Sequence, residues 1–293
     1  SVASSGLQAN GFVDTHASGQ QTSSSDGRFS VFWSLADNLV TGDSNGTGDV
    51  FVHDPVTGMT QLVSQALSGS TGNGLSAAAA ISAFGGFVVF QSDADNLVVG
   101  DNNGAADIFV RDLQTGVTTL VSKDTLGNQA RGDSLNPTIS ADGRFIAFES
   151  FASNLVSGDN NGALDVFLHD RLTGETSLIS TTGAGSGNSR SFSPTISVDG
   201  RFVSFASAAT DLTSGEANGD LAVDLYQRDT LLGETKRFAL GIEDAGALLI
   251  TASRLDGTIA VEYLTAGTSS GRLGSDVATV NASGVTTITS NGQ

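Results

Sequence analysis

Three short loops repeat one arrangement of oxygen-bearing side chains, and this arrangement is the best candidate for chemistry in the sequence. Each loop reads Asp, any residue, Asn, Gly, any two residues, Asp. In calcium-binding loops, oxygens at alternate positions converge on one cation, and a glycine permits the sharp turn between them. The pattern therefore predicts calcium as a cofactor in at least one loop. The candidate ligands are Asp43, Asn45, Asp49, Asp101, Asn103, Asp107, Asp159, Asn161 and Asp165.

The same loops also allow a purely structural interpretation. Asn and Asp side chains often cap their own backbone in turns and tolerate left-handed conformations. The first carboxylate of the full calcium pattern is missing, because Thr41, Val99 and Ser157 occupy its position. In favour of a cation, two like charges in one short loop repel each other unless something lies between them. Any metal is expected in units one to three, with the fourth also open, because the copy at residues 216–219 is altered and the fifth unit keeps no such cluster around residues 271–276.

The loops occupy equivalent places in a repeat that runs along the chain. Residues 140–150 (SADGRFIAFES) have counterparts at 24–34, 82–92 and 197–207, and a more divergent one at 254–264. Five units of about 58 residues use all 293 residues, which predicts one domain over residues 1–293. The glycines that mark the repeat are Gly27, Gly85, Gly143, Gly200 and Gly257.

Each unit is expected to form four short strands. In the third unit these are residues 136–140, 144–150, 165–170 and 176–180, with the Asp-Gly pair turning the chain between the first two. Repeated four-stranded units without helices predict an all-β fold, a five-bladed β-propeller of four-stranded antiparallel blades. Phenylalanines paired on the second strands are expected to pack one blade against the next, and the fifth unit lacks them. The expected blades cover approximately residues 1–64, 65–122, 123–180, 181–240 and 241–293.

These motifs carry a resemblance to a known repeat. The run PTISADGRFIAFES, followed by DVFLHD and TGETSLIS, resembles the TolB-like (WD-repeat-like) propeller repeat of bacteria. The loop variant NLVxGDxNGxxDVF resembles copies in large secreted or surface proteins of bacteria. The resemblance covers four units well and the fifth poorly. It implies an extracellular or cell-surface protein, with the periplasm also open, and it implies little about activity because propellers host many unrelated functions.

The composition excludes several classes of function. Thirty-one acidic against 13 basic residues give a net charge of -18, which would repel phosphate backbones, so no nucleic-acid partner is expected. The absence of cysteine excludes disulfides, zinc-thiolate sites and cysteine enzymes. No apolar run approaches the roughly 20 residues that span a bilayer, so no membrane insertion is expected.

An enzymatic function is not expected. Five-bladed propellers include glycoside hydrolases, which need two carboxyl groups facing one substrate. The expected first strands, including residues 20–24 in the first unit, contain no acid, and most acids recur in each unit as scaffold residues would. The non-recurring acids Asp93, Asp133, Glu149 and Glu262 form no recognisable set. Residues 267–271 match the pattern G-x-S-x-G, but they lie in a loop rich in Ser and Gly and lack the context of a nucleophile elbow.

The sequence thus predicts a non-enzymatic, calcium-stabilised propeller that serves as a structural or interaction module of a secreted or surface protein. The expected partners are other surface proteins or copies of the chain itself. One alternative is a carbohydrate-binding module, a lectin or adhesin domain, for which Trp33 at the end of a second strand could stack on a sugar. A second alternative is an enzyme like the five-bladed glycoside hydrolases.

Overall fold

The chain folds into antiparallel sheets of four consecutive strands. The computed structural model describes residues 3–4, 6–14, 21–214 and 223–238, together with the backbone of four later strands at 245–253, 259–265, 274–280 and 286–290. Four sheets have described side chains, and the four later strands pair in the same consecutive order. The described residues contain no helix, and so none that could cross a membrane. The all-β class and the blade-like sheets are confirmed.

The strand limits follow the repeat. Sheet one contains β1 (Val13–Asp14), β2 (Ser30–Ser34), β3 (Asp49–Asp54) and β4 (Met59–Leu62). Sheet two contains β5 (Ser76–Ile81), β6 (Phe87–Ser92), β7 (Asp107–Asp112) and β8 (Thr118–Leu120). Sheet three contains β9 (Ser134–Ile139), β10 (Phe145–Ser150), β11 (Asp165–Asp170) and β12 (Glu175–Leu178). Sheet four contains β13 (Ser191–Ile196), β14 (Phe202–Ser207), β15 (Asp224–Asp229) and β16 (Glu234–Phe238). The later strands are β17 (Ala245–Ser253), β18 (Ile259–Thr265), β19 (Gly274–Val280) and β20 (Thr286–Ser290).

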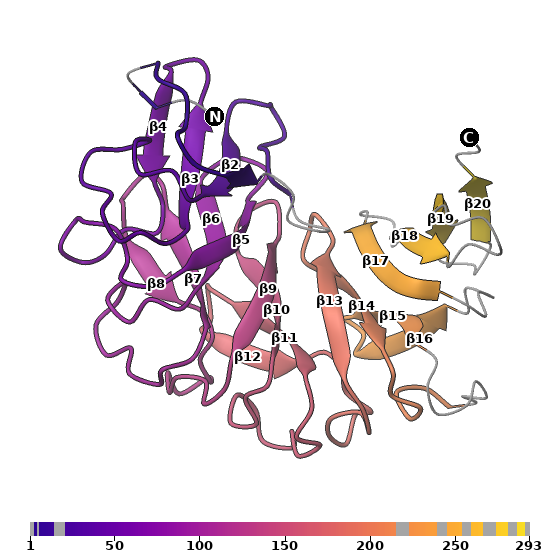
Figure 1. Cartoon of the computed structure of the whole chain (residues 1–293). Coiled ribbons are helices and arrows are strands. Elements are labelled where there is room, and N and C mark those ends of the chain that lie inside the picture. The colour runs from indigo at the N-terminus through magenta and orange to yellow at the C-terminus, as the bar shows by residue number, and fades with distance from the viewer. Residues whose placement is uncertain are drawn as a thin grey trace.

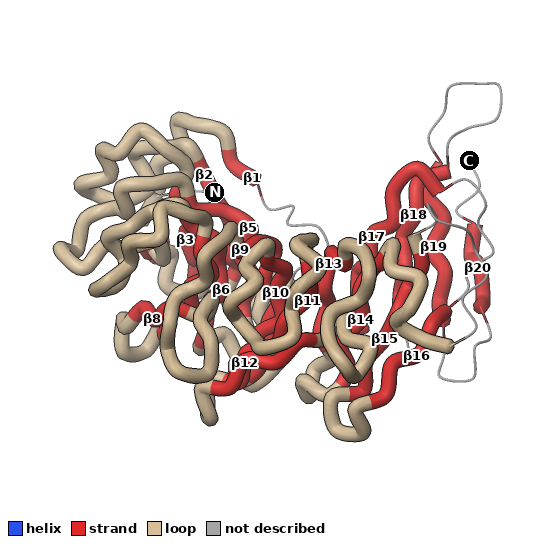
Figure 2. Tube along the Cα trace, turned by 90° about the horizontal axis from the view of Figure 1, so that it is seen from below, coloured by secondary structure: helices blue, strands red, loops and turns tan. Residues whose placement is uncertain are grey.

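The sheets follow one another around an arc, with sheet one at one end and β17–β20 at the other (Figures 1 and 2). The first strands of sheets two, three and four contact each other, which places them on the inner side of the arc. Because neighbouring strands are antiparallel, the loops fall at two opposite ends of each sheet. One end carries the loops between the second and third strands of each sheet and the links from one sheet to the next, and we call it the link end. We call the end with the two tight turns of each sheet the turn end.

The core consists of apolar layers between neighbouring sheets. The stacked rings of Phe90 and Phe109, with centroids 5.8 Å apart, pack against Val31 and Val50 of the preceding sheet. Phe148 and Phe167 of sheet three pack in the same way against Val89 and other residues of sheet two. Each fully buried ring contributes roughly 1.5–3 kcal/mol to folding. The expected role of the phenylalanines between sheets is confirmed for the described sheets.

A second inter-sheet contact joins a phenylalanine at or just before the start of the second strand of sheets one, two and three to a glycine in the tight turn of the next sheet. Phe145 lies directly against Gly200 in the tight turn of sheet four, and a Cβ atom on that glycine would overlap the ring. Gly200 also has a φ of 77°, a left-handed conformation that a glycine adopts without strain. Phe87 and Gly143 repeat the arrangement between sheets two and three. The repeated Asp-Gly turn is therefore required for its shape and for close approach.

The first strands of sheets two, three and four carry a β-bulge. In sheet two, the pairing with β6 shifts between Ala77 and Ala80, and Ala78 has a φ of 48°. Asn136 and Ser193 occupy the same place in sheets three and four, with φ of 49° and 52°. Left-handed backbone is costly for residues other than glycine, so the inner edge of the arc carries local strain.

The first strand of sheet one differs from the prediction. The sequence predicts residues 20–24 as this strand, but β1 is Val13–Asp14, which pairs with Ser34 and Trp33 of β2. Ser23 adds only an isolated bridge to Ser30. In sheet two only three residues lie between Ala77 and Ile81, which form the corresponding pairs, whereas eight residues lie between Asp14 and Ser23. The expectation that first strands contain no acid is therefore wrong for Asp14.

Candidate functional site

The three predicted calcium loops lie at the link end, where each contacts the link to the next sheet. Asn45 accepts a hydrogen bond from the Thr47 amide at its Oδ1 (3.0 Å). The Asn45 Nδ2 donates to Asp49 Oδ2 (2.7 Å) and to the carbonyl oxygen of Gly72 in the link (2.9 Å). Asn103 and Asn161 make the same three kinds of contact in sheets two and three. Each asparagine therefore forms an Asx turn and fastens its loop to the neighbouring link.

The second aspartate of each loop is fully buried. Asp49, Asp107 and Asp165 are 0% exposed. Burial raises the pKa of each carboxyl to about 6, although hydrogen bonds from the loop asparagine and from a serine oppose this. The serine is Ser64 in sheet one, whose hydroxyl donates to Asp49 Oδ1 at 2.6 Å. These carboxylates sit where charge is costly unless it is compensated.

The first aspartate of each loop lies near the second. Burial raises the pKa of Asp43, Asp101 and Asp159, and the negative charge of each in turn raises the pKa of its buried partner. The loops thus bring two carboxylates together, as the sequence indicated. Within the described residues, however, no group of three or more acidic, histidine or cysteine side chains gathers as a metal site.

The three loops differ in what lies beside the two carboxylates. In sheet two, the Gln129 Nε2 donates to Asp101 Oδ1 (2.6 Å) and to Asp107 Oδ2 (3.3 Å). The Gln129 amide therefore bridges the two carboxylates. In sheet three, the corresponding link residue is the shorter Ser186, which also hydrogen-bonds Asp159. The Oδ1 atom of Asp159 is buried without a hydrogen-bond partner. We number the loops by their sheets; among the six loop aspartates, only Asp159 of loop three has a buried carboxylate oxygen without a hydrogen-bond partner.

Sequence reasoning missed the link residues that complete these sites. Ser64, Ser122 and Ser180 each donate to the buried aspartate, and their spacing of 58 residues was a visible signal. Gln129 gave no such signal, because Thr71 and Ser186 occupy its position in the other links. The altered loop at residues 216–219 and the G-x-S-x-G string at 267–271 lie outside the described residues.

The inner side of the arc holds a non-recurring acid. Glu149 on β10 is 4% exposed, and burial raises its pKa. Its carboxylate accepts hydrogen bonds from Asn136 Nδ2 (2.6 Å) and from the backbone amide of Ser193 in the next sheet (2.7 Å). The two donors are bulge residues with positive φ. Glu149 therefore ties sheet three to sheet four.

An aromatic pair and two acids lie near the ends of the inner strands at the link end. The rings of Phe12 and Trp33 are 5.7 Å apart, and Phe12 is 60% exposed. Trp33 and Leu75 both approach Gly48, and Leu75 accepts a backbone hydrogen bond from Asp93. Burial raises the pKa of Asp93, and the charge of Asp133 adds to this effect. Two of the non-recurring acids are thus close enough to interact.

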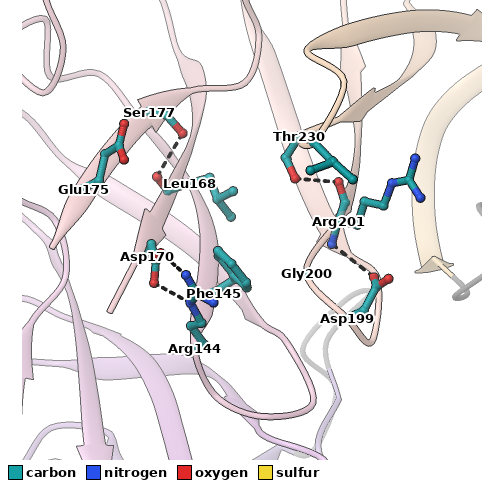
Figure 3. A pocket seen from close by; sticks show the side chains of 11 residues that line it. Arg144, Phe145, Leu168, Asp170, Glu175, Ser177, Asp199, Gly200, Arg201 and Thr230 are labelled. Atoms are coloured by element: carbon teal, nitrogen blue, oxygen red, sulfur yellow. Dashed lines mark hydrogen bonds and ion pairs between the residues drawn. The ribbon is translucent and has the colours of Figure 1, made fainter. Parts of the chain in front are cut away.

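The turn end contains a cavity of about 470 Å³ between sheets three and four (Figure 3). Arg144 borders it and makes a bidentate contact with Asp170, Nε to Oδ1 at 2.9 Å and Nη2 to Oδ2 at 2.7 Å. This contact holds the pKa of Asp170 at about 2. Phe145, Leu168 and Leu231 give the cavity an apolar lining, and Glu175 and Asp199 add carboxylates.

Comparison with known proteins supports the fold. No protein-family profile matches the chain, and no curated protein sequence is similar to it. TolB from Acinetobacter baumannii has a similar structure, with a TM-score of 0.52 and 16% identity over 96% of this chain and 55% of that one. A structure described as TolB from Agrobacterium tumefaciens has a TM-score of 0.54 and 15% identity over 97% of this chain and 82% of that one. The tricorn protease gives 0.53 and 14% identity over 89% of this chain and 25% of that one.

At this level of identity the comparisons establish the fold alone. The chain has a TolB-like β-propeller fold, and it spans about half the length of the TolB of A. baumannii. A protease also contains a similar propeller, so the fold does not define an activity.

Proposed function

We propose that the chain is a five-bladed propeller that acts as a non-enzymatic structural or interaction module of a bacterial surface or secreted protein, stabilised by calcium. The observation that carries this proposal is the repeated pair of carboxylates beside a link, of which the second is fully buried in each loop. Three such pairs occur at the junctions between sheets, where a bound cation would stiffen the arc without any need for a substrate. The expected partners are other surface proteins or further copies of the chain.

The residues of loop three fit a calcium ion best. Asp159 and Asp165 would hold it through oxygen atoms, the ligands that calcium prefers. The unpartnered Oδ1 of Asp159 supports this choice. Loop two fits it least, because Gln129 already donates to both carboxylates. The loop asparagines would serve as braces for the carboxylates, since their Oδ1 atoms already accept backbone hydrogen bonds.

The non-enzymatic role is supported by the engagement of the recurring acids. Asp142 and Asp199 accept hydrogen bonds from a serine and a backbone amide within their own tight turns. Asp170 and Asp229 are paired with arginines. A carboxylate held in this way is a poor general acid or base. An extracellular location is consistent with the calcium proposal, because weak sites with dissociation constants of roughly 10⁻⁴–10⁻³ M are typical of extracellular modules.

The calcium proposal is tested by thermal unfolding in millimolar calcium and in chelator. One site filled to ten times its dissociation constant adds about 1.4 kcal/mol, which corresponds to a rise of about 3–6 °C in the melting temperature. The variant Asp159→Asn should lose most of this rise. Asp211→Asn is the matched control, because its Oδ1 accepts the Asn188 amide and asparagine keeps that acceptor. Identical melting curves with calcium and with chelator would show that the loops are structural turns only.

Carbohydrate binding is the second candidate function, favoured by the neighbouring rings of the exposed Phe12 and the partly buried Trp33. Asp93 follows in the next sheet, where its amide donates to Leu75, a residue that approaches Gly48 as Trp33 does. Aromatic faces can stack on sugar rings, and carboxylates accept hydrogen bonds from hydroxyl groups. Trp33 is the only tryptophan of the chain, so its fluorescence reports on this place directly. A glycan that binds here should change the fluorescence emission of Trp33 in the wild type, and it should leave the emission of the Phe12→Ala variant unchanged. A glycan array without hits, together with concentration-dependent self-association, would favour the structural role instead.

A further inference from the structure

The cavity between sheets three and four lies beside a residue that is smaller than its counterparts in the other sheets. Three hairpin-turn residues occupy equivalent positions, because each backbone amide donates to the corresponding carbonyl of the tight turn in its own sheet. The bonds are Leu113 to Gly86, Arg171 to Arg144 and Thr230 to Arg201. Leu113 packs into the apolar layer between sheets one and two. Thr230 is much smaller than Leu113 or Arg171, and the cavity opens beside it.

Arg171 shows which group the neighbouring junction accepts at this position. Its guanidinium lies 4.0 Å from the centroid of the Phe87 ring and donates from Nη1 to the carbonyl oxygen of Gly143 at 2.6 Å. The charges of Asp112 and Asp142 favour its protonated form, although burial lowers its pKa. A guanidinium between sheets two and three is thus held by an aromatic ring, a carbonyl and two acids.

The junction between sheets three and four keeps most of these partners. Phe145, Gly200 and Asp199 correspond to Phe87, Gly143 and Asp142. The face of Phe145 is already covered by Arg144, 4.5 Å from the ring centroid. The Gly200 carbonyl and the Asp199 carboxylate therefore remain as the partners for a second cation.

The charge of the cavity also differs from that of the neighbouring junction. Arg144 is neutralised by Asp170, and Arg201 by Asp229. Glu175 borders the cavity where sheet two has the apolar Val117. Among the described residues, neither Glu175 nor Asp199 forms an ion pair, although the charge of Asp199 acts on Arg201 from a distance. Leu168 and Leu231 provide an apolar surface for an aliphatic stem.

We infer that this cavity receives an arginine side chain of a partner polypeptide. The stem would lie on Leu168 and Leu231, and the guanidinium would reach the Gly200 carbonyl and Asp199, with Glu175 nearby. The inference rests on the proposed interaction role for its biological meaning. It concerns the turn end, however, and the binding step is independent of the calcium loops at the link end.

The test measures binding of a capped Gly-Arg-Gly peptide by amide chemical shifts in two-dimensional NMR spectra. The peptide should shift Gly200, Thr230 and Leu231, and the matching citrulline peptide, which is neutral and nearly isosteric, should not. Asp199→Asn keeps the acceptor for Ser197 and Arg201, and Glu175→Gln keeps the shape of the side chain. Each should weaken binding about two- to fivefold, as expected for the loss of one partly exposed charge pair. Thr230→Arg should abolish binding, because it supplies the guanidinium from within the chain.

Equal binding of the arginine and citrulline peptides would overturn the inference, and so would unchanged binding by the two charge variants. The melting temperature of Thr230→Arg shows whether that variant folds. If it does not fold, binding by Asp199→Asn and Glu175→Gln tests the inference instead. Tighter binding of free arginine than of the capped peptide would overturn the polypeptide source. The titration is performed in chelator, so a failed calcium proposal leaves the result interpretable.

Discussion

Replacing the glycine of one tight turn measures how strongly the sheets depend on their mutual contact. Gly27 and Gly200 have similar left-handed φ values of 69° and 77°. A Cβ atom at position 27 would meet nothing within 4 Å, whereas at position 200 it would overlap the ring of Phe145. Left-handed backbone costs an alanine about 1–2 kcal/mol. Overpacking adds about 1–3 kcal/mol. Gly27→Ala should therefore cost about 1–2 kcal/mol and Gly200→Ala about 2–5 kcal/mol.

The assay is thermal unfolding followed by circular dichroism, with about 2–4 °C expected per kcal/mol in a chain of this size. A double-mutant cycle with Phe145→Ala separates the two contributions. Without the ring, Gly200→Ala should cost no more than Gly27→Ala costs in the wild type. Equal losses for Gly27→Ala and Gly200→Ala in the wild-type background would refute the close inter-sheet contact. A Gly200→Ala cost that persists in full without Phe145 would refute it as well.

Two further predictions concern a buried histidine and the strained inner strands. Burial lowers the pKa of His169 to about 4, with the charge of Lys123 adding to the effect. Because the folded value lies below the unfolded 6.5, this neutral histidine favours the fold fully above pH 6.5 and loses that contribution as the pH falls toward 4. The difference between the two pKa values, at about 1.4 kcal/mol per unit, corresponds to roughly 3 kcal/mol of stability. Urea unfolding at pH 7 and at pH 4.5 should show that His169→Gln loses less free energy of unfolding on acidification than the wild type does. Equal losses in the two proteins would contradict the assignment. Ala78→Gly should raise the melting temperature by a few degrees, because glycine removes the cost of a φ of 48°. The neighbouring, buried Ala79→Gly should lower it, and a loss at both positions would argue against the bulge.

The strands of the repeat could be predicted because their signals are local. Residues 145–150 are a short run rich in apolar residues that is bounded by turn residues, and β10 covers them with five of its six residues buried. The first strand of sheet one could not be predicted in this way. Val13 and Asp14 are a strand only because they pair with Trp33 and Ser34, a contact that no local pattern near residue 13 reports. Pairing across an insertion is a tertiary property.

The carboxylate pairs could be predicted for a similar reason, since both members lie in one loop of seven residues. The expected repulsion between them is present in their pKa values. What could not be predicted is how the protein itself relieves it. Gln129 comes from the next link and differs from Thr71 and Ser186 at the same position, so the repeat pattern gave no reason to single it out. The calcium prediction consequently applies most strongly to loop three.

The hydrogen bond between each loop asparagine and the following link has a consequence for how such a chain can grow. Asn45 contributes the donor from one unit, and Gly72 contributes the acceptor from the start of the next. Any segment of one repeat length therefore contains one such asparagine donor and one such link carbonyl, whichever residue it starts from. A gene duplication of that length would insert a unit whose two new junctions are already complementary. The number of units could thus change by one without loss of the hydrogen bond that joins each loop to its link.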